Sequence, residues 1–407
     1  MAGEPGDAAT AVVGVAAPSG AVVEVSWPDI VRLVDRDPRL SAGQFLVEAA
    51  RGGLDAAGAV PNPTLEGTVG QGSARTGGAA RLEWGLGLTM PLGWLAQRGA
   101  RVDAAVAQLD VALAERRALR RDVLLRLRTM FWRLAYERAR VTSLAQLEMQ
   151  TAALVQTVKK RVERGAVRPI EATRVEIELE KVTSELESAR SSLAARAAEL
   201  TLWLGLPAGG TLVPLAQFEA LSVAPKRDTA LARARATHPV LAVARAKARL
   251  LEAELGAEKM ARVPALSLSG VSSYEIDRRS YGLGVAVDLP LWNWNSGRVA
   301  AAEAKLAAGR MQAEAADLEV GASTLEAQAA CAAAVVGATR FGSELVPRAE
   351  IVAATMERTY QLGEASLLEV IDARRTLLDA RGQYLRALVE AQIDCSRLGA
   401  LLEEEPK

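Results

Sequence analysis

The sequence contains few of the side chains on which catalytic and metal sites depend. The 407 residues include one His and two Cys, which excludes most zinc, haem and iron–sulfur sites. The chain has no phosphate-binding glycine loop and no nucleophile elbow, so it is predicted to be no enzyme and to hold no cofactor or metal. The single histidine, His238, precedes a proline at the start of a helical pattern and is expected to cap that helix.

An excess of positive charge is also lacking. Lys and Arg together number 49, and so do Asp and Glu, so the chain has no basic surplus for neutralising phosphates. This balance argues against nucleic-acid binding. No Lys or Arg precedes Arg32, so the basic segment that opens a signal peptide is not evident, and residues 1–28 are predicted to form a disordered tail.

Large apolar side chains and long apolar runs are scarce. Aromatic residues make up only 4% of a chain that is 50% apolar, so most of the apolar content is Ala, Leu and Val, which suits closely packed long helices. The lack of an uninterrupted stretch of about 18 apolar residues argues against a membrane-spanning helix, but not against the alternating strands of a β-barrel. Cys331 and Cys395 fall in separate helical patterns and are expected to be small apolar residues, with a disulfide as the alternative.

The chain repeats its own pattern after about 200 residues, which indicates an internal duplication into residues 29–228 and 229–407. Short motifs recur in the same order in both halves. The recurring pairs are Asp37-Pro38-Arg39-Leu40 with His238-Pro239-Val240-Leu241, Pro63-Thr64-Leu65 with Pro264-Ala265-Leu266, Met90-Pro91-Leu92 with Leu289-Pro290-Leu291, Arg164-Gly165-Ala166 with Leu362-Gly363-Glu364, and Leu204-Gly205 with Leu398-Gly399.

Each repeat has the same predicted elements: a short helix, a β-hairpin, a long helix, a tip and a medium helix. The long helices are expected over 99–163 and 298–362, and at about 1.5 Å per residue each reaches roughly 95–100 Å. Apolar residues spaced seven apart favour packing of these long helices against neighbouring helices. The hairpins are predicted over 63–91 and 264–290, the tips over 164–168 and 363–365, and the medium helices over 169–205 and 366–403, with a linker up to residue 228.

One strand of each hairpin alternates between apolar and small or polar side chains. The runs from Leu82 to Met90 and from Tyr281 to Leu289 are about ten residues each, the length of a tilted membrane-crossing strand. Two ordinary hairpins packed on a helical body are the alternative. Because the smallest barrels have about eight strands, a membrane barrel would require oligomerisation. The candidate aromatics at a membrane interface are Trp84, Trp94, Tyr281, Trp292 and Trp294.

Two segments of the second repeat carry a family resemblance: Leu345-Val346-Pro347-Arg348-Ala349-Glu350, and Tyr360-Gln361-Leu362-Gly363-Glu364-Ala365-Ser366-Leu367-Leu368-Glu369-Val370-Ile371-Asp372-Ala373-Arg374-Arg375. A weaker counterpart begins at Arg164-Gly165-Ala166. With these motifs the sequence resembles the TolC-like outer-membrane efflux channels, and among them the heavy-metal and drug branch that works with resistance-nodulation-division pumps. The resemblance covers about residues 29–405. It implies a mainly α fold with a small β part, in which a trimer builds a periplasmic α-barrel and each protomer gives four strands to one 12-stranded membrane β-barrel.

The resemblance also implies a function: a passive exit duct in the outer membrane with a periplasmic extension. Its partners would be outer-membrane lipid, a periplasmic adaptor, and an inner-membrane resistance-nodulation-division or ABC pump, which together open the tip. The exported substrate is left open, because the pump selects it. The alternatives are the outlet of a type I secretion system, which uses the same fold, and a soluble periplasmic coiled-coil adaptor or scaffold.

The resemblance places adaptor contacts at the two tips, here Gly165-Ala166-Val167 and Gly363-Glu364-Ala365, although these glycines could simply end helices with positive φ. Tyr360 matches a family tyrosine that ties adjacent helices in the closed state.

Glu369 and Asp372 share one helix face just inside the second tip. Three copies would place six carboxylates around the pore and attract cations. The alternative is a solvated helix start, where the helix dipole favours acidic side chains. In the first repeat the corresponding positions are Glu171 and Arg174, and Arg174 could pair with Asp372 or Glu369.

Overall fold

The computed structural model describes residues 22–73, 77, 79–207, 211–218, 221–276 and 278–402. The chain forms two compact units, and each unit takes segments from both predicted repeats. One, here called the tip unit, comprises the chain up to Asp37, Arg121–Ala230 and the chain from Thr324; the other, the sheet unit, comprises Pro38–Arg120 and Leu231–Ser323. The compact units therefore do not coincide with the sequence halves, and the repeat boundaries at 29–228 and 229–407 stay a prediction.

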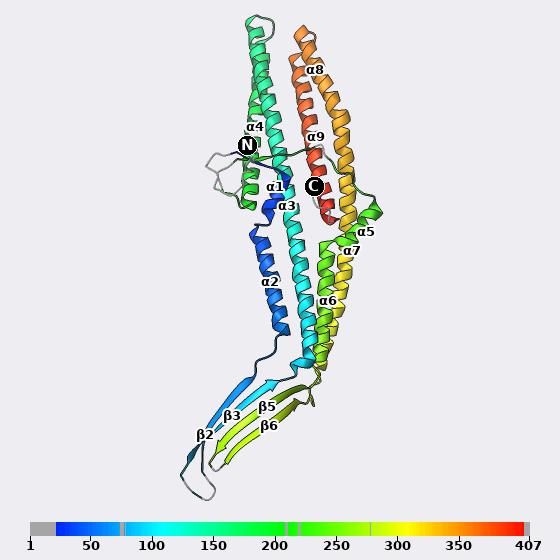
Figure 1. The fold of residues 1–407 in the computed structure, drawn as a ribbon. Coiled ribbons are helices and arrows are strands. Elements are labelled where there is room, and N and C mark those ends of the chain that lie inside the picture. The colour runs from blue at the N-terminus through cyan, green and yellow to red at the C-terminus, as the bar shows by residue number, and fades with distance from the viewer. Residues whose placement is uncertain are drawn as a thin grey trace, which may run out of the picture. The chain divides into compact units, whose positions relative to one another are not determined.

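The sheet unit contains one four-stranded antiparallel sheet (Figure 1). The order is β2-β3-β5-β6, so β2 and β6 are its two edges. Strands β3 and β6 contain the alternating runs that the sequence identifies, with bounds that differ from the predicted runs by a few residues. The bounds are Thr64–Gly72 for β2, Arg81–Pro91 for β3, Ala265–Glu275 for β5 and Arg278–Asp288 for β6.

The register gives this sheet two chemically different faces. Residues directly opposite each other in an antiparallel pair share a face, and Leu65 lies opposite Leu88 while Leu268 lies opposite both Met90 and Val285. The apolar side chains of one face, here called the apolar face, are Leu65, Val69, Leu82, Trp84, Leu86, Leu88, Met90, Leu266, Leu268, Tyr274, Tyr281, Leu283, Val285 and Val287. The other face, here called the polar face, carries mostly Ser, Thr, Gly and charged residues, among them Thr68, Glu83, Gly85, Ser269, Ser273 and Gly284.

Five helical segments complete the sheet unit: α2 (Pro38–Gly58), the first part of α3 (Trp94–Glu163), most of α5 (Arg227–Thr237), α6 (Pro239–Met260) and most of α7 (Ser296–Arg340). His238 caps α6 as expected, because its Nδ1 accepts a hydrogen bond from the backbone N–H of Val240 at 3.2 Å. Ion pairs tie α6 to α3 through Lys247 and Glu115 at 2.7 Å and to α7 through Glu252 and Arg310 at 3.4 Å.

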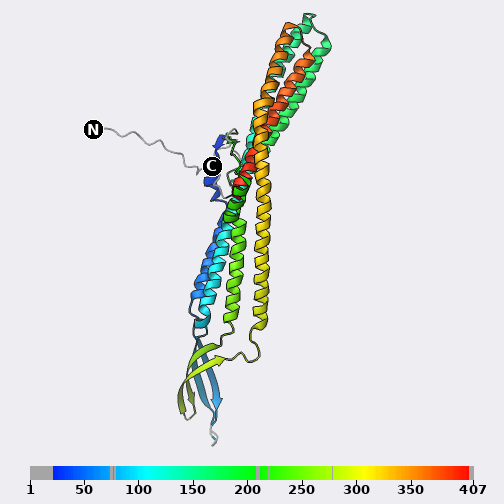
Figure 2. The ribbon, with the colours of Figure 1, turned by 90° about the vertical axis from the view of Figure 1, so that its right-hand side faces the viewer.

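The tip unit contains two helical hairpins (Figures 1 and 2). The first joins the end of α3 to α4 (Pro169–Trp203), and the second joins α8 (Val346–Leu362) to α9 (Leu367–Leu401). The helix predicted over 298–362 is not uniform, because a π-helical turn over Phe341–Leu345 separates α7 from α8. Pro347 is a physical reason for this correction: it has no N–H to donate to the carbonyl of Ser343, so regular α-helical bonding cannot continue there.

Within the described part of the chain, one helical span is long and apolar enough to cross a bilayer by length and composition alone. This span, Ser296–Leu362, comprises α7, the π-helical turn and α8. Its segment from Gly321 to Ala338 is rich in alanine rather than in large apolar residues. The sequence criterion of an uninterrupted apolar run therefore excluded this span too strictly, although one such helix is weak evidence of a membrane crossing.

The chain before residue 29 is partly ordered, which corrects the prediction of a disordered tail over 1–28. Residues 1–21 lie outside the described residues. Strand β1 (Val22–Val25) pairs in parallel with β4 (Thr211–Pro214), a strand inside the predicted linker, and α1 (Trp27–Val34) follows. The physical reason is burial: Val25 and Trp27 are core residues. The linker also leads into an unpredicted helix, α5 (Arg227–Thr237).

An aromatic cluster holds this N-terminal segment against α3. The Trp27 and Phe131 ring centroids lie 6.3 Å apart, and the Arg128 guanidinium lies 4.8 Å from the Trp27 ring centroid. Burial lowers the pKa of Arg128 to about 10, still far above neutral pH, so the side chain stays charged and can interact with the indole face. Order at residues 22–34 thus comes from tertiary packing that local sequence does not reveal.

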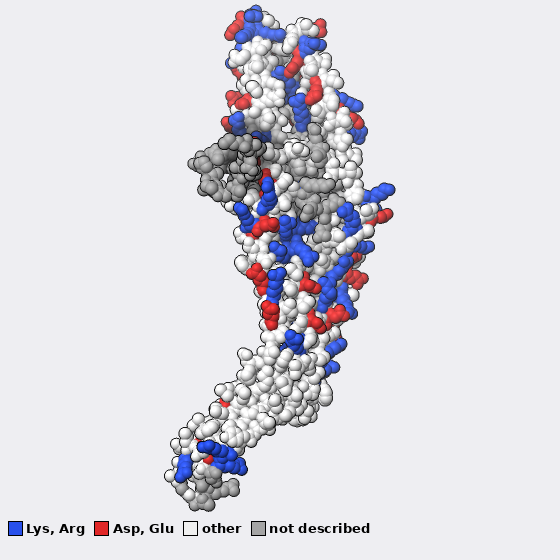
Figure 3. Space-filling model, viewed as in Figure 1, with Lys and Arg blue, Asp and Glu red and all other residues white. Residues whose placement is uncertain are grey.

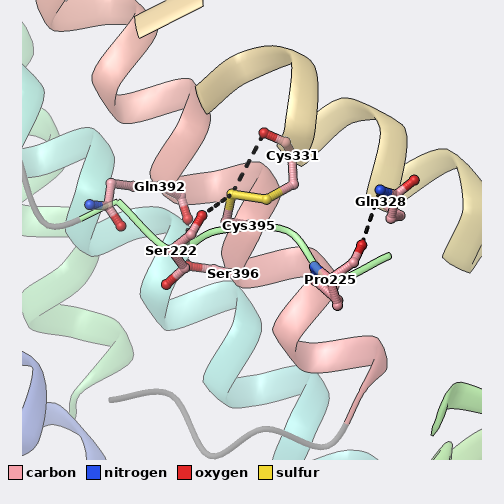
Figure 4. Close-up of a disulfide and its surroundings, with 7 residues drawn as sticks. All are labelled: Ser222, Pro225, Gln328, Cys331, Gln392, Cys395 and Ser396. Carbon is pink, nitrogen blue, oxygen red and sulfur yellow. Dashed lines mark hydrogen bonds between the residues drawn. A yellow bond between two sulfur atoms is a disulfide. The ribbon is translucent and has the colours of Figure 1, made fainter. Parts of the chain in front are cut away.

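Cys331 and Cys395 form a disulfide, which corrects the expectation of two separate apolar residues (Figure 4). The bond joins α7 to α9, with 4.7 Å between the two Cα atoms and a sequence separation of 64. Periodicity along each helix could not show that the two positions face each other. Close to this bond, Gln392 Nε2 donates to the Phe218 carbonyl at 3.1 Å and Gln328 Nε2 donates to the Pro225 carbonyl at 3.2 Å, which fixes the linker against both helices.

Candidate functional site

Both predicted tips are tight reversals, and they lie at the same end of the tip unit (Figures 1 and 2). Gly165 and Gly363 adopt φ values of 69° and 81°, the left-handed conformation that ends helices and favours glycine. The interpretation of these glycines as helix ends is therefore confirmed. Ala166 and Glu364 are exposed beyond them, whereas Val167 and Ala365 are partly buried.

A hydrophobic cluster, here called the tip cluster, joins the two hairpins just inside the tips. Tyr360 is buried in it, and the Arg161 guanidinium lies 4.6 Å from its ring centroid. Arg161 Nη1 also donates to the Tyr360 carbonyl at 3.5 Å. Tyr360 thus connects the second hairpin to α3 within one protomer. The buried members of the cluster are Val155, Val158, Val175, Tyr360, Leu367 and Val370.

Glu369 acts as a helix cap in this chain. Its Oε2 accepts hydrogen bonds from the Ser366 backbone N–H at 2.7 Å and from the Ser366 hydroxyl at 2.9 Å, and Ser366 Oγ accepts from the Glu369 N–H at 3.3 Å. This reciprocal arrangement is a capping box. The backbone and hydroxyl hydrogen bonds from Ser366 lower the pKa of Glu369 below its ordinary value. The carboxylate is exposed, so capping and a place in a pore ring are compatible.

The second carboxylate of the predicted ring, Asp372, is also exposed. It lies one turn beyond Glu369, on the same side of α9, as the i, i+3 spacing requires. Glu171 lies 3.9 Å from Arg168 in its own first turn, and Arg174 is exposed on α4. The roles of these four residues in a gate stay predictions.

The ion pair that joins the hairpins was not among the predicted residues. Arg375 on α9 makes two hydrogen bonds to the Glu178 carboxylate on α4, and this contact raises the pKa of Arg375. The pair lies about one turn further along than Arg174 and Asp372, with the charges exchanged between the helices. Two other arginines tie α9 to its own hairpin partner α8: Arg374 to Glu357 and Arg381 to Glu350, each at 2.7 Å. The run of Arg374 and Arg375 was the available sequence signal.

The predicted interface aromatics occupy both ends of the sheet. Trp84 and Tyr281 lie on its apolar face, where their rings are exposed. At the opposite end, Trp292 is 93% exposed and Trp294 is 60% exposed in the segment between β6 and α7. Trp94 begins α3 and is partly buried. Large exposed aromatic rings at two levels are typical of a sheet that crosses a bilayer.

This chain is similar in sequence to proteins of known families. Residues 30–206 and 230–403 match a family model described as outer membrane efflux protein. The cobalt-zinc-cadmium resistance protein CzcC of Cupriavidus metallidurans is 26% identical over 357 residues, which cover 86% of this chain and 82% of that protein.

Solved structures share the fold. A membrane protein from Pseudomonas aeruginosa superposes with a TM-score of 0.78 at 17% identity, covering 99% of each chain. CusC, described with transmembrane channel formation, superposes with a TM-score of 0.76 at 18% identity, covering 94% of this chain and 93% of CusC. The mainly helical fold with a small sheet is therefore confirmed.

Proposed function

The chain belongs to the outer membrane efflux protein family, and from this membership we propose that three copies assemble into one passive duct across the outer membrane. The protein is the outer-membrane component of an efflux system, with a periplasmic extension.

The observation that carries the proposal is the two-faced sheet with two free edges. Four strands cannot close a barrel, because the smallest barrels have about eight strands. If β6 of one copy pairs with β2 of the next, three copies give 12 strands and no edge is left unpaired. The apolar face then contacts lipid, and the polar face, with Glu66, Glu83 and Asp288, lines the interior.

Exposed apolar residues on the helices of the sheet unit support the same assembly. Phe45 and Leu46 on α2 are 67% and 66% exposed, and Met311 and Leu318 on α7 are 61% and 66% exposed. Apolar patches of this kind mark protein contacts. In a ring of copies, the α2 side of one protomer would cover the α7 side of the next.

The tip of the duct is proposed as the gate and as the docking point of a periplasmic adaptor. The exposed tip residues Ala166 and Glu364 are available for such a contact. Three copies of Glu369 and Asp372 would ring the opening with carboxylates, which attract cations. An inner-membrane pump, of the resistance-nodulation-division type, would supply the energy, and the duct itself would perform no chemistry.

Divalent metal cations are the proposed cargo. CzcC is named as a cobalt-zinc-cadmium resistance protein, and acidic residues at the tip and on the polar face of the sheet favour cation passage over anion passage. The cargo of a duct depends on its pump, so this proposal also specifies a metal-exporting pump as partner.

Assembly and selectivity can be tested together. Purified protein should run as a trimer in detergent and form channels in planar bilayers. Replacing Glu369→Ala and Asp372→Ala together should reduce cation selectivity and block by divalent ions, whereas Glu364→Ala, outside the ring, should leave both unchanged. Unchanged selectivity in the double variant would remove these residues from the gate.

The alternatives give different outcomes. A monomer that stays dissolved without detergent and forms no channel would support a soluble adaptor or scaffold. A trimer that co-purifies with an ATP-driven protein exporter, rather than with a metal pump, would support the outlet of a type I secretion system.

A further inference from the structure

The apolar face of the sheet carries a single cation among the described residues. Arg279 on β6 lies opposite Tyr274, which in turn lies opposite Trp84. By the alternation of the strands, Arg279 therefore shares a face with the leucines, valines and aromatic rings. Its neighbour Arg278 lies opposite Glu275 and belongs to the polar face.

Arg279 belongs to an organised row of side chains. The Trp84 and Tyr274 rings stack with centroids 6.4 Å apart and an interplanar angle of 17°. The guanidinium carbon of Arg279 lies 5.7 Å from the centroid of the same Tyr274 ring. The row crosses three strands and ends in a cation at the sheet edge, and stacking on the tyrosine orients the guanidinium without occupying its N–H donors.

The described carboxylates near this end of the sheet lie on the other face. Glu275 is 3.9 Å from Arg278, and Glu83 lies opposite Gly70 on the polar face. Figure 3 shows that charged side chains are rare over the visible part of the sheet and gather at the hairpin ends. None of the described carboxylates lies on the face that carries Arg279. Because an unpaired charge beside lipid is costly, an anion from outside the chain would stabilise this arginine.

The position of Arg279 matches the outer boundary of a bilayer. From Arg279 to Val287, β6 extends about 27 Å at about 3.4 Å per residue. A tilt of about 40° reduces this to about 21 Å along the membrane normal, close to the apolar band of about 25 Å in such barrels. The strand ends near Val287 lead to the helices, so the hairpin end with Arg279 would lie in the outer leaflet.

We propose that Arg279 binds a phosphate group of lipid A, a glycolipid of the outer leaflet. Trp84 and Tyr274 would contact the same lipid where its saccharide joins its acyl chains. This inference rests on the proposed membrane-spanning role of the sheet. A guanidinium forms paired hydrogen bonds to phosphate oxygens, and aromatic side chains favour the headgroup level. Lipid A carries phosphates at this level, on a saccharide that can lie against the aromatic row.

The neighbouring arginines provide a matched test. Wild type, Arg279→Gln and Arg278→Gln would be purified in detergent and titrated with bisphosphorylated lipid A and with its dephosphorylated form, with bound lipid counted by native mass spectrometry. Arg279→Gln should weaken binding of the phosphorylated lipid about tenfold, the loss expected for one charge-assisted interaction. Arg278→Gln removes the same charge from the opposite face and should leave binding within about twofold of wild type.

Additional measurements distinguish a failure of the lipid A proposal from a failure of the proposed membrane-spanning role of the sheet. Arg279→Lys should retain part of the binding, because the charge remains while the paired geometry is lost. Equal losses in Arg278→Gln and Arg279→Gln, or equal binding of both lipid forms to wild type, would overturn the proposal. Failure of the wild type to form trimers or to insert into phosphatidylcholine vesicles would instead overturn the proposed function of the sheet.

Discussion

Arg375 on α9 and Glu178 on α4 form an ion pair across the two helical hairpins of the tip unit. The Glu178 side chain is only 13% exposed, so removal of its partner leaves a largely buried carboxylate unpaired. Among the described residues this is the ion pair that joins α4 to α9, since Arg374 and Arg381 pair with α8 in their own hairpin. A protomer whose hairpins separate during opening must break it.

Removal of this pair should favour the open tip. We expect Arg375→Ala to destabilise the closed arrangement by about 1 kcal/mol, at the upper end for a pair of this exposure, and to raise the open fraction of channels in planar bilayers. The control is Arg381→Ala, which breaks an ion pair of similar exposure inside one hairpin and should not change the open fraction. Equal effects of the two variants would show that the cross-hairpin contact has no special part in closure.

The capping carboxylate Glu369 should make the second tip sensitive to acid. Because its pKa is lowered in the folded chain, its contribution to stability is present above the ordinary glutamate pKa of about 4.3 and is lost as the pH falls below that value. Glu369→Gln should abolish this part of the pH dependence. The measurement is hydrogen exchange at residues 366–370 between pH 3 and 6. An identical pH profile in the variant would contradict the assignment.

Gly342, in the π-helical turn, lies close against the ring of Tyr384 on α9. A Cβ atom there would lie 2.8 Å from ring atoms of Tyr384, so Gly342→Ala should cost about 1–3 kcal/mol through overpacking. Gly337→Ala is the matched control: a Cβ atom at that position meets nothing within 4 Å, and replacing a helical glycine should stabilise by up to about 1 kcal/mol. Thermal unfolding measures both.

A second variant separates a steric clash from a general loss of helix stability. In a Tyr384→Leu background the ring is absent, so Gly342→Ala should become nearly neutral there. If the substitution remains as damaging without the ring, the close approach of Tyr384 is not its cause.

The disulfide should add markedly to stability. Replacing both cysteines, Cys331→Ala with Cys395→Ala, should lower the free energy of unfolding by about 2–4 kcal/mol, because the oxidised unfolded chain is constrained by a closed loop. Reduction of the wild-type protein with dithiothreitol should give a similar fall in the unfolding midpoint, and reductant should have no effect on the double variant. A reductant effect that persists in the double variant would point to another cause.

The elements that follow from local pattern could be predicted from the sequence. Alternation located β3 and β6, because a strand with two different environments has a period of two. Gly165 and Gly363 located the tips, because a left-handed residue ends a helix at low cost only when it is glycine. His238 was identified as a cap for a similarly local reason.

The features that the sequence did not reveal depend on contacts between distant segments. The pairing of β1 with β4 and the pairing of Cys331 with Cys395 join positions that no local pattern relates. The contact of Arg375 with Glu178 depends on the angle at which α9 passes α4, which the sequence of either helix does not give. Arg279 was missed because a lone arginine beside a turn is ordinary until the register places it among apolar residues.

The bond between Cys331 and Cys395 turns the second hairpin into a covalent ring, with Gly363 midway between the two sulfur-bearing residues along the chain. A protease that cuts once at the exposed tip therefore releases no fragment, since both new ends remain attached at the base. A single cut in the tip would thus leave α8 and α9 joined to each other through the disulfide.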